Sequence, residues 1–283
     1  MEIHFKKKDE RAVLRLRESR GVPYLSFPAL EETGLVAHAF STRLGGVSKG
    51  DFATMNFSFT RGDNPDDVLE NYGRMAAALG VEKEKMVLTY QTHTTNVRRV
   101  TEEDAGKGVV RERDYRDVDG LITDIPGITL VTFFADCVPL YFLDPVRRAI
   151  GLSHSGWRGT VNRMGQKTAE AMKEAFGTEP KDLIACVGPS ICADCYEVGP
   201  EVAGAFADSF GEAHRERILK EKENGKYLLD LWEANRIVLL EAGIRPEKIS
   251  VTNICTHCNP ELLFSHRRNA ERRGNLCAFL SLK

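Results

Sequence analysis

The sequence predicts an α+β fold in which mixed β-sheets are flanked by helices. Short apolar runs suited to buried strands, such as residues 128–134 and 183–187, are interspersed with helical patterns. A reversal between two apolar runs at residues 144–147 indicates an antiparallel hairpin, whereas other strands lead directly into helices. This combination favours an α+β architecture over a regular doubly wound sheet.

The organisation of the chain indicates one continuous unit. No linker, repeat or change of composition divides the 283 residues. We therefore expect a single domain over residues 1–283, with N-terminal strands within residues 1–24. Further strands are expected at residues 35–40, 86–90, 249–254 and 276–280.

Helices are predicted where apolar residues recur at three- and four-residue steps. Residues 67–79 follow this pattern, and Gly80 lies at the expected C-terminal stop. Residues 161–176 end in the same way at a glycine. Pro200 suits the first position of a helix, and further helices are expected at residues 200–210 and 230–243.

The composition is that of an ordinary globular protein. The net charge of −2 indicates no electrostatic surface for nucleic acid or membranes. No apolar run approaches the roughly 20 residues that span a bilayer, and the N-terminus lacks a secretory apolar segment. Seven cysteines, an odd number, favour reduced thiols. We therefore expect a cytoplasmic protein that binds neither nucleic acid nor membranes; the sequence does not indicate a protein partner.

The reversal at residues 144–147 places two metal-ligating residues in apparent register. Asp and Pro occupy the first two positions of a type I turn, so directly opposed residues would have numbers that sum to 291. Cys137 and His154 satisfy that sum and would lie on the same face of the hairpin. Pro139 lies between them, and a bulge there could shift the register.

His93, Cys137 and His154 form the strongest candidate site, because each lies at the end or edge of a predicted strand. One thiolate and two neutral imidazoles suit zinc, and three protein ligands leave a fourth position open. The alternative is that the three residues have separate structural roles, as a buried thiol and two hydrogen-bonded imidazoles.

Two glycine-containing loops have the chemistry of anion contacts. Arg43, Gly45 and Gly46 follow the predicted strand at residues 35–40, although an ordinary glycine turn explains this loop as well. Arg158 lies where a helix is expected to begin after His154, so backbone N–H groups and its guanidinium could hold a phosphate. A salt bridge of Arg158 to a carboxylate is the alternative.

Four other cysteines form two C-x-x-C pairs, at Cys192 with Cys195 and Cys255 with Cys258. Their separation of 60 positions exceeds the roughly 15–20 residues of ribbon-type zinc sites. We therefore favour scattered reduced thiols over structural zinc for these pairs. The sequence lacks dinucleotide-binding and P-loop glycine motifs and a complete nucleophile elbow, which lowers the expectation of the corresponding chemistries.

Seven short motifs together resemble the YfiH or laccase-domain family, described as multicopper polyphenol oxidoreductases and as purine nucleoside phosphorylases. The resemblance extends from about residue 25 to the C-terminus. In chain order the motifs are Thr42-Arg43-x-Gly45-Gly46-Val47-Ser48, Gln91-Thr92-His93, Ala135-Asp136-Cys137-x-Pro139, His154-Ser155-Gly156-Trp157-Arg158-Gly159, Gly188-Pro189-Ser190-Ile191, Tyr196-Glu197-Val198 and Phe264-Ser265-His266-Arg267-Arg268.

The resemblance implies a YfiH-like fold and a zinc-dependent site whose ligands match His93, Cys137 and His154. It also implies phosphorolysis of adenosine, inosine and methylthioadenosine, and deamination of adenosine. Purine nucleosides and phosphate are therefore the expected binding partners. The segment after Arg268 departs from the family's usual Arg-Arg-acidic pattern, because Asn269 and Ala270 follow.

Roles can be assigned to these residues on that basis. Arg43 and Arg158, with the backbone of Gly45 and Gly46, would position phosphate for attack at the anomeric carbon of ribose. For deamination, water activated by zinc would attack C6 of adenine. Asp136 is the candidate for proton transfer, so the expected catalytic set is His93, Cys137, His154, Asp136 and Arg158.

Two other functional classes are alternatives. A copper-dependent polyphenol oxidase would use similar ligands, since copper outranks zinc in divalent affinity. Multicopper clusters require many imidazoles, however, and the seven histidines include no His-x-His pair. A zinc-stabilised binding module is the third class, and the glycine–arginine loops around an open metal position argue against it.

Overall fold

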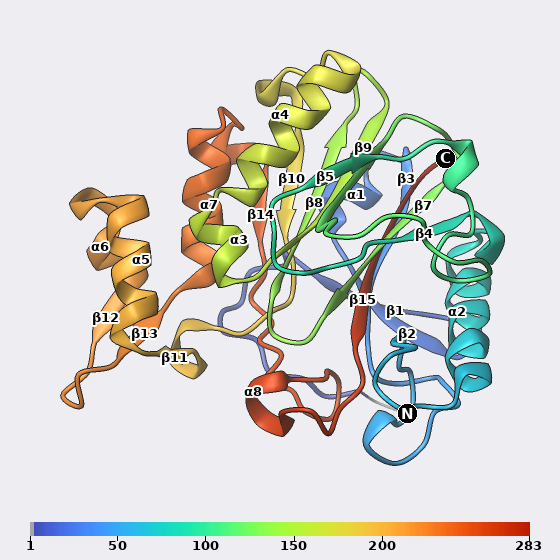
Figure 1. Ribbon diagram of the computed structural model, residues 1–283, viewed down its shortest axis with the longest axis horizontal. Coiled ribbons are helices and arrows are strands. Elements are labelled where there is room, and N and C mark those ends of the chain that lie inside the picture. The colour runs from blue at the N-terminus through green and yellow to red at the C-terminus, as the bar shows by residue number, and fades with distance from the viewer. Residues whose placement is uncertain (1–2) are drawn as a thin grey trace.

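The computed structural model describes residues 3–283, so residues 1 and 2 of the expected domain lie outside the described part. Its first sheet has six strands, and the C-terminal strand β15 lies inside it, antiparallel to β3 and to β7 (Figure 1). Strand β4 pairs parallel with β7, so the sheet is mixed. In spatial order the strands are β1 (Arg15–Ser19), β2 (Val22–Ser26), β3 (Val36–Ser41), β15 (Leu276–Leu282), β7 (Thr129–Phe134) and β4 (Met86–Leu88).

The second sheet also has six strands and is built around an antiparallel hairpin of β8 and β9. Parallel pairs occur at its edges, between β5 and β6 and between β10 and β14. In spatial order the strands are β14 (Ile249–Val251), β10 (Ile184–Val187), β8 (Val138–Asp144), β9 (Ala149–Ser155), β6 (Gly120–Thr123) and β5 (Val97–Arg99). The two mixed sheets confirm the predicted α+β class.

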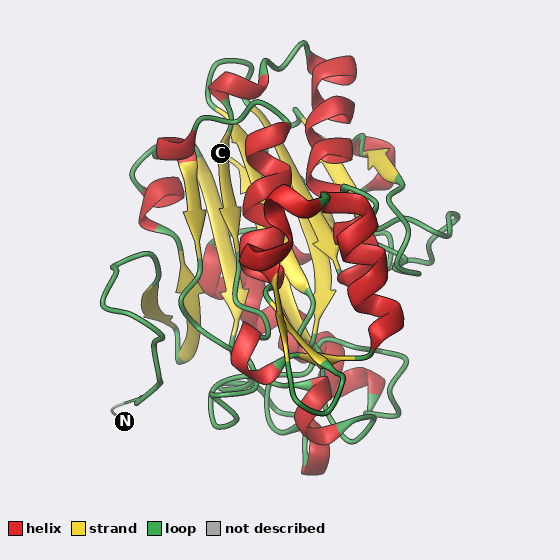
Figure 2. Cartoon of the chain, turned by 90° about the vertical axis from the view of Figure 1, so that its left-hand side faces the viewer, coloured by secondary structure: helices red, strands yellow, loops and turns green. Residues whose placement is uncertain are grey.

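Helices cover the outer faces of both sheets (Figures 1 and 2). Helix α2 lies on the first sheet, whereas α4 and α7 lie on the second. The described helices are α1 (Pro28–Glu31), α2 (Pro65–Leu79), α3 (Trp157–Val161), α4 (Met164–Phe176), α5 (Pro200–Phe210), α6 (Glu212–Ile218), α7 (Leu231–Glu241) and α8 (His266–Asn269). A small sheet of β11 (Glu197–Val198), β13 (Tyr227–Leu229) and β12 (Leu219–Glu221) lies beside α5 and α6.

Strand β15 shows how the layers are held together. Its alternate residues Leu276, Ala278 and Leu280 enter the core between the two sheets. Cys277 and Phe279 point to the opposite face and pack in the core beneath α2. Both faces of this strand are therefore buried, which explains its near-continuous apolar sequence.

The hairpin register predicted from the sequence is wrong by two residues. Pro139, not Cys137, lies opposite His154, and Asp144 pairs with Ala149. The connection contains four residues, 145–148, because Asp144 Oδ1 accepts the N–H groups of Val146 and Arg147 and the chain then continues through a left-handed residue. A shift of two preserves the face on which each side chain lies.

Two predicted helices also differ at their starts. Helix α2 begins at Pro65, because the Asn64 side chain accepts the N–H of Asp66 and caps the first turn. The helix expected at residues 161–176 is divided into α3 and α4, because Arg163 adopts a left-handed conformation with φ of 63°. Helices α5 and α7 confirm the two predictions nearer the C-terminus.

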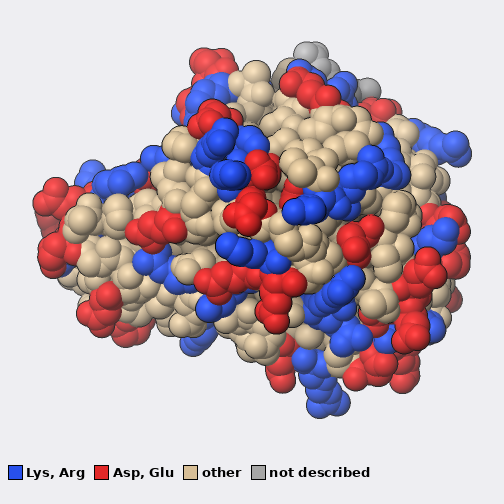
Figure 3. Space-filling model, turned by 90° about the horizontal axis from the view of Figure 1, so that it is seen from above, with Lys and Arg blue, Asp and Glu red and all other residues tan. Residues whose placement is uncertain are grey.

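The surface carries charges of both signs. Figure 3 shows acidic and basic side chains interspersed over the face seen from above. None of the helices within residues 3–283 is long and apolar enough to cross a membrane.

Candidate active site

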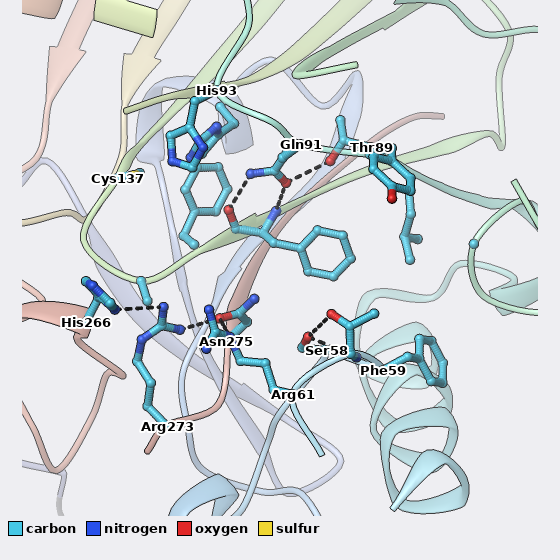
Figure 4. Close-up of a pocket in the computed structure, with 18 of the residues that line it drawn as sticks. Ser58, Phe59, Arg61, Thr89, Gln91, His93, Cys137, His266, Arg273 and Asn275 are labelled. Carbon is cyan, nitrogen blue, oxygen red and sulfur yellow. Dashed lines mark hydrogen bonds between the residues drawn. The ribbon is translucent and has the colours of Figure 1, made fainter. Parts of the chain in front are cut away.

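A cavity of about 580 Å³ opens beside the carboxyl end of β7 (Figure 4). Its volume lies within the range of about 300–1,000 Å³ that is usual for small-molecule sites. The side chains around it are both aromatic and charged, so it offers apolar walls together with polar groups. It is lined by Ser58, Phe59, Thr60, Arg61, Leu88, Thr89, Tyr90, Gln91, His93, Gly108, Arg113, Phe133, Phe134, Ala135, Cys137, His154, His266, Arg273 and Asn275.

His93, Cys137 and His154 converge on one wall of this cavity. One potential ligand atom from each residue lies within 4.8 Å of the other two. His154 belongs to β9, Cys137 to the bend between β7 and β8, and His93 to a loop that follows β4. The structure thus brings together the three residues that the sequence predicted as metal ligands.

Asp119 orients two of these residues and was missed by the sequence analysis. Its fully buried carboxylate accepts a hydrogen bond from His154 Nδ1 at 2.8 Å. It also accepts the backbone N–H groups of Thr92, His93 and Thr94 at 3.0–3.1 Å. His154 therefore keeps Nε2 available for a metal, the arrangement that a carboxylate–histidine–metal site requires. In the sequence, an Asp-Gly pair before a strand does not indicate this role for Asp119.

The local backbone leaves room for a metal among these side chains. Gly156 lacks the Cβ that would lie 2.9 Å from His93 Cδ2 and 3.1 Å from Cys137 Sγ. His93 has a φ of 65°, a left-handed conformation that is uncommon outside glycine and asparagine. Hydrogen bonds from the loop N–H groups to Asp119 hold the loop in this conformation. The donor set, its orienting carboxylate and this space together fit zinc.

Electrostatics favour the thiolate form of Cys137. Burial raises the pKa of this thiol, but His154 and His93 outweigh burial and lower the pKa to about 6. Burial likewise lowers the pKa of His154, whereas Cys137 and Asp119 raise it to about 9. The two side chains therefore stabilise each other as an ion pair. The thiolate is the form that binds metals, and a bound cation would replace the proton that His154 Nε2 carries in this pair.

The opposite end of the cavity is cationic (Figure 4). Arg273 is only 6% exposed, and its Nε has no hydrogen-bond partner within residues 3–283. Its other nitrogens contact the Gly274 carbonyl, Asn275 Oδ1 and His266 Nδ1. Burial and the nearby Arg61 charge lower the pKa of Arg273 to about 10. A buried guanidinium with an unused donor is suited to an anion.

Arg61 lies beside Arg273 and shares a partner with it. Arg61 Nε donates to Asn275 Oδ1 at 3.1 Å, and its Nη1 forms a salt bridge with Glu271 at 2.5 Å. Neither arginine belongs to a motif quoted from the sequence, and their approach depends on the pairing of the C-terminal segment with the chain before α2. Spacing alone contained no signal for this cluster.

Asp136 lies next to the candidate ligands but does not line the cavity. Its carboxylate accepts hydrogen bonds from Thr256 Oγ1 at 2.5 Å, Ser265 Oγ at 3.0 Å and the Arg267 N–H at 2.6 Å. With a φ of 85°, it forms the tight bend that presents Cys137. These contacts describe a residue that fixes the bend, and its predicted role in proton transfer stays a prediction.

The residues predicted to bind phosphate lie outside the cavity lining. Arg43 donates to the carbonyls of Ala53 and Pro260, so its guanidinium is occupied within the chain. A Cβ on Gly46 would lie 2.1 Å from a backbone oxygen, and one on Gly45 would lie 2.7 Å from another. The two glycines therefore permit close packing of this loop.

Arg158 has a different setting. It lies exposed on α3, with its guanidinium over the Trp157 ring at 4.4 Å. The structure does not bring Arg158 into one cluster with Arg43. The assignment of phosphate binding to these two arginines therefore stays a prediction.

Comparisons with known proteins agree with this architecture. Purine nucleoside phosphorylase YlmD of Bacillus subtilis is 35% identical over 252 residues, which cover 88% of this chain and 89% of that protein. Adenosine deaminase RL5, from an unknown prokaryotic organism, is 34% identical over 232 residues, covering 81% and 88% respectively. The crystal structure of Bacillus licheniformis hypothetical protein YfiH matches with a TM-score of 0.89 and 32% identity, over 95% of this chain and 99% of that one.

The resemblance drawn from the motifs is confirmed at the level of the family. A family model described as multi-copper polyphenol oxidoreductase laccase matches residues 37–283, which is most of the chain. The relatives above share more than 30% identity with it over most of both sequences. The chain therefore belongs to this laccase-like family, together with the proteins named YlmD and YfiH.

Proposed function

We propose that the protein is a zinc-dependent purine nucleoside phosphorylase that also deaminates adenosine. The observation that carries this proposal is a single cavity with three metal-ligating side chains at one end and a buried, partly unpartnered arginine at the other. The names of the relatives, purine nucleoside phosphorylase and adenosine deaminase, support the same reading. We propose adenosine, inosine and methylthioadenosine as substrates.

His93, Cys137 and His154 would hold the zinc ion, with Asp119 fixing the imidazole of His154. When bound there, zinc supplies Lewis-acid polarisation and activation of water near neutral pH. The chain's own contribution is to present one thiolate and two imidazoles within 4.8 Å of one another. Gly156 keeps the space between them clear.

Arg273, Arg61 and His266 are the residues that we propose for phosphate. The guanidinium groups of Arg273 and Arg61 lie side by side, and with Arg61 paired to Glu271 they leave a net positive charge that an anion can neutralise. A phosphate oxygen held there would attack C1′ of the ribose. The C1′–N9 bond would then break, and the purine would leave with the bonding electron pair and take up the proton that the attacking hydrogen phosphate releases.

Aromatic side chains of the cavity wall suit the nucleoside. Phe59, Tyr90 and Phe133 line the cavity and are only partly buried. Gln91 holds the backbone of Phe133 in place, because its side-chain amide accepts the Phe133 N–H at 2.7 Å and donates to the Phe133 carbonyl at 2.9 Å. A flat purine can stack on such surfaces.

The alternative function is a copper-dependent polyphenol oxidase. The family description favours it, since it names multicopper oxidoreductases. Among the described residues, however, the three-residue cluster is the one metal-ligating group that contains imidazoles, and it contains two of them. A multicopper cluster needs more imidazoles than this site provides.

Product analysis separates these functions. Protein made without added copper is analysed for metals and incubated with adenosine, with and without phosphate. Adenine and ribose-1-phosphate formed only with phosphate would support phosphorolysis, and inosine formed without phosphate would support deamination. Stoichiometric copper with phenol oxidation and no turnover of any purine nucleoside would overturn the proposal.

Substitutions then test the two ends of the cavity. Cys137→Ala should remove the metal from this cavity and abolish turnover. Arg273→Met should raise the phosphate KM. In the same assay, Arg43→Met and Arg158→Met test whether the two glycine-containing loops predicted from the sequence contribute to phosphate binding. If Arg273→Met keeps the wild-type phosphate KM and Arg43→Met raises it, phosphate binds at the glycine loop that contains Arg43 and not beside Arg273.

A further inference from the structure

Four cysteines outside the candidate active site form a second compact group. Atoms Sγ of Cys192, Cys195, Cys255 and Cys258 all lie within 4.8 Å of one another. Spacing alone favoured scattered thiols for these residues, and the fold instead brings the two C-x-x-C pairs together. The cause is the parallel pairing of β10 with β14, which aligns the segments that follow the two strands.

We propose that these four cysteines bind a second zinc ion in a structural site made of four thiolates. In a tetrahedral zinc–thiolate centre, bonds of about 2.3 Å place the sulfur atoms about 3.8 Å apart. The sulfur atoms of Cys195 and Cys258 lie 3.5 Å apart, and all four sulfur atoms lie within 4.8 Å of one another, close to the separation that zinc requires. Four thiolates without an open position are typical of structural rather than catalytic zinc.

A hydrogen-bond donor and a cation lie beside the cluster. Cys192 and Cys255 are buried, and the Cys192 N–H donates to Cys255 Sγ at 3.3 Å. Lys8 lies close by, because its Nζ donates to the carboxylate of Asp194, which lies between Cys192 and Cys195 in the sequence, at 2.8 Å. A cation and an N–H donor are the groups that orient and neutralise a thiolate-rich metal site.

The proposed site joins two segments that support the bend carrying Cys137. Next to Cys192, the Ile191 N–H donates to the Asp136 carbonyl at 3.0 Å. Next to Cys255, Thr256 Oγ1 donates to the Asp136 carboxylate at 2.5 Å. A metal bound by both cysteine pairs would therefore hold together the two segments that contact Asp136. The metal itself would lie outside the cavity.

Metal content and sulfur coordination test the proposal on the intact, unmodified protein. Protein produced in zinc-supplemented medium is purified under reducing conditions, and its zinc is measured by elemental analysis and X-ray absorption. We expect two zinc ions per chain. One should have a single sulfur ligand, from Cys137, and the other should have four, from the cluster. A single zinc ion with one sulfur ligand would overturn the proposal.

Variants assign the two ions separately. Cys258→Ser should lose one zinc and retain the ion with a single sulfur ligand, whereas Cys137→Ala should lose that ion and retain the one with four. Cys186→Ala is the matched control, because Cys186 is buried and lies outside both groups. It should keep both ions.

Thiol labelling of the wild-type protein gives a second readout that does not depend on variant folding. We expect the cluster cysteines to resist alkylation until a zinc chelator is added. Immediate labelling without chelator, or disulfides in the reduced zinc-loaded protein, would contradict a four-thiolate zinc site. Failure of this test leaves the proposed phosphorylase function standing, since that depends on the other ion.

Discussion

Asp119→Asn should weaken metal binding although Asp119 is not itself one of the three candidate ligands. One oxygen of Asp119 accepts from His154 Nδ1 and the His93 N–H. The other accepts from the N–H groups of Thr92 and Thr94 and from the Thr94 hydroxyl. In the asparagine variant, the side-chain NH₂ group would replace one of these two acceptor oxygens and would face hydrogen-bond donors that then lack an acceptor.

The size of the effect follows from these contacts. Unpaired buried donors cost about 1–3 kcal/mol each, and two or three would result, so the local penalty is about 2–9 kcal/mol. Thr92 and His93 are exposed, so the loop can open to water and the rest of the chain should stay folded. Loss of such orienting contacts lowers metal affinity about 10- to 100-fold.

Competition with a chromogenic zinc chelator measures this change, and circular dichroism checks the fold. Asp117→Asn is the matched control, because Asp117 Oδ1 accepts one hydrogen bond from Thr92 Oγ1 and asparagine tolerates its left-handed φ of 54°. We expect the control to change zinc affinity by no more than about twofold. Wild-type zinc affinity in Asp119→Asn would refute the orienting role of this carboxylate.

Two glycines and one histidine give further predictions. Gly156→Ala should lower zinc affinity by at least about tenfold, as other perturbations around metal ligands do, because its Cβ would press on His93 and Cys137; equal affinity by chelator competition would contradict it. Gly204→Ala in α5 meets no atom of the described residues within 4 Å and should raise the free energy of unfolding by about 0.4–1 kcal/mol in urea titrations; a loss of stability would refute this. Burial lowers the pKa of His38 from 6.5 to about 4 while its Nε2 accepts the Phe27 N–H. The unfolded chain therefore binds the extra proton, and about 3 kcal/mol of stability is lost as pH falls from 6.5 to 4; His38→Gln should remove this slope, and an unchanged slope would contradict the assignment.

Local patterns predicted the elements of this fold well, because each pattern reflects contacts made within a few residues. The helix at residues 67–79 and the strands that became β7, β10 and β15 illustrate this. The hairpin register was missed because Arg148 adds a left-handed residue to the connection. Apolar periodicity contains no information about such a step.

The candidate ligands were predictable because cysteine and histidine have distinctive chemistry at the ends of strands. Asp119 and Arg273 were not, because their roles depend on hydrogen bonds to residues brought near by the fold. The four-cysteine group was misjudged for a related reason. Its two pairs meet through the pairing of β10 with β14, which the distance between them in the sequence does not reveal.

The most direct test of the proposed active site is the rate of ribose-1-phosphate formation from adenosine as a function of phosphate concentration. Zinc-loaded wild-type protein should form this product, and Cys137→Ala should not. Arg273→Met should raise the phosphate KM about 10- to 100-fold, the loss expected for a hydrogen bond to a charged group. Wild-type rates and phosphate KM in both variants would show that phosphorolysis does not take place in this cavity.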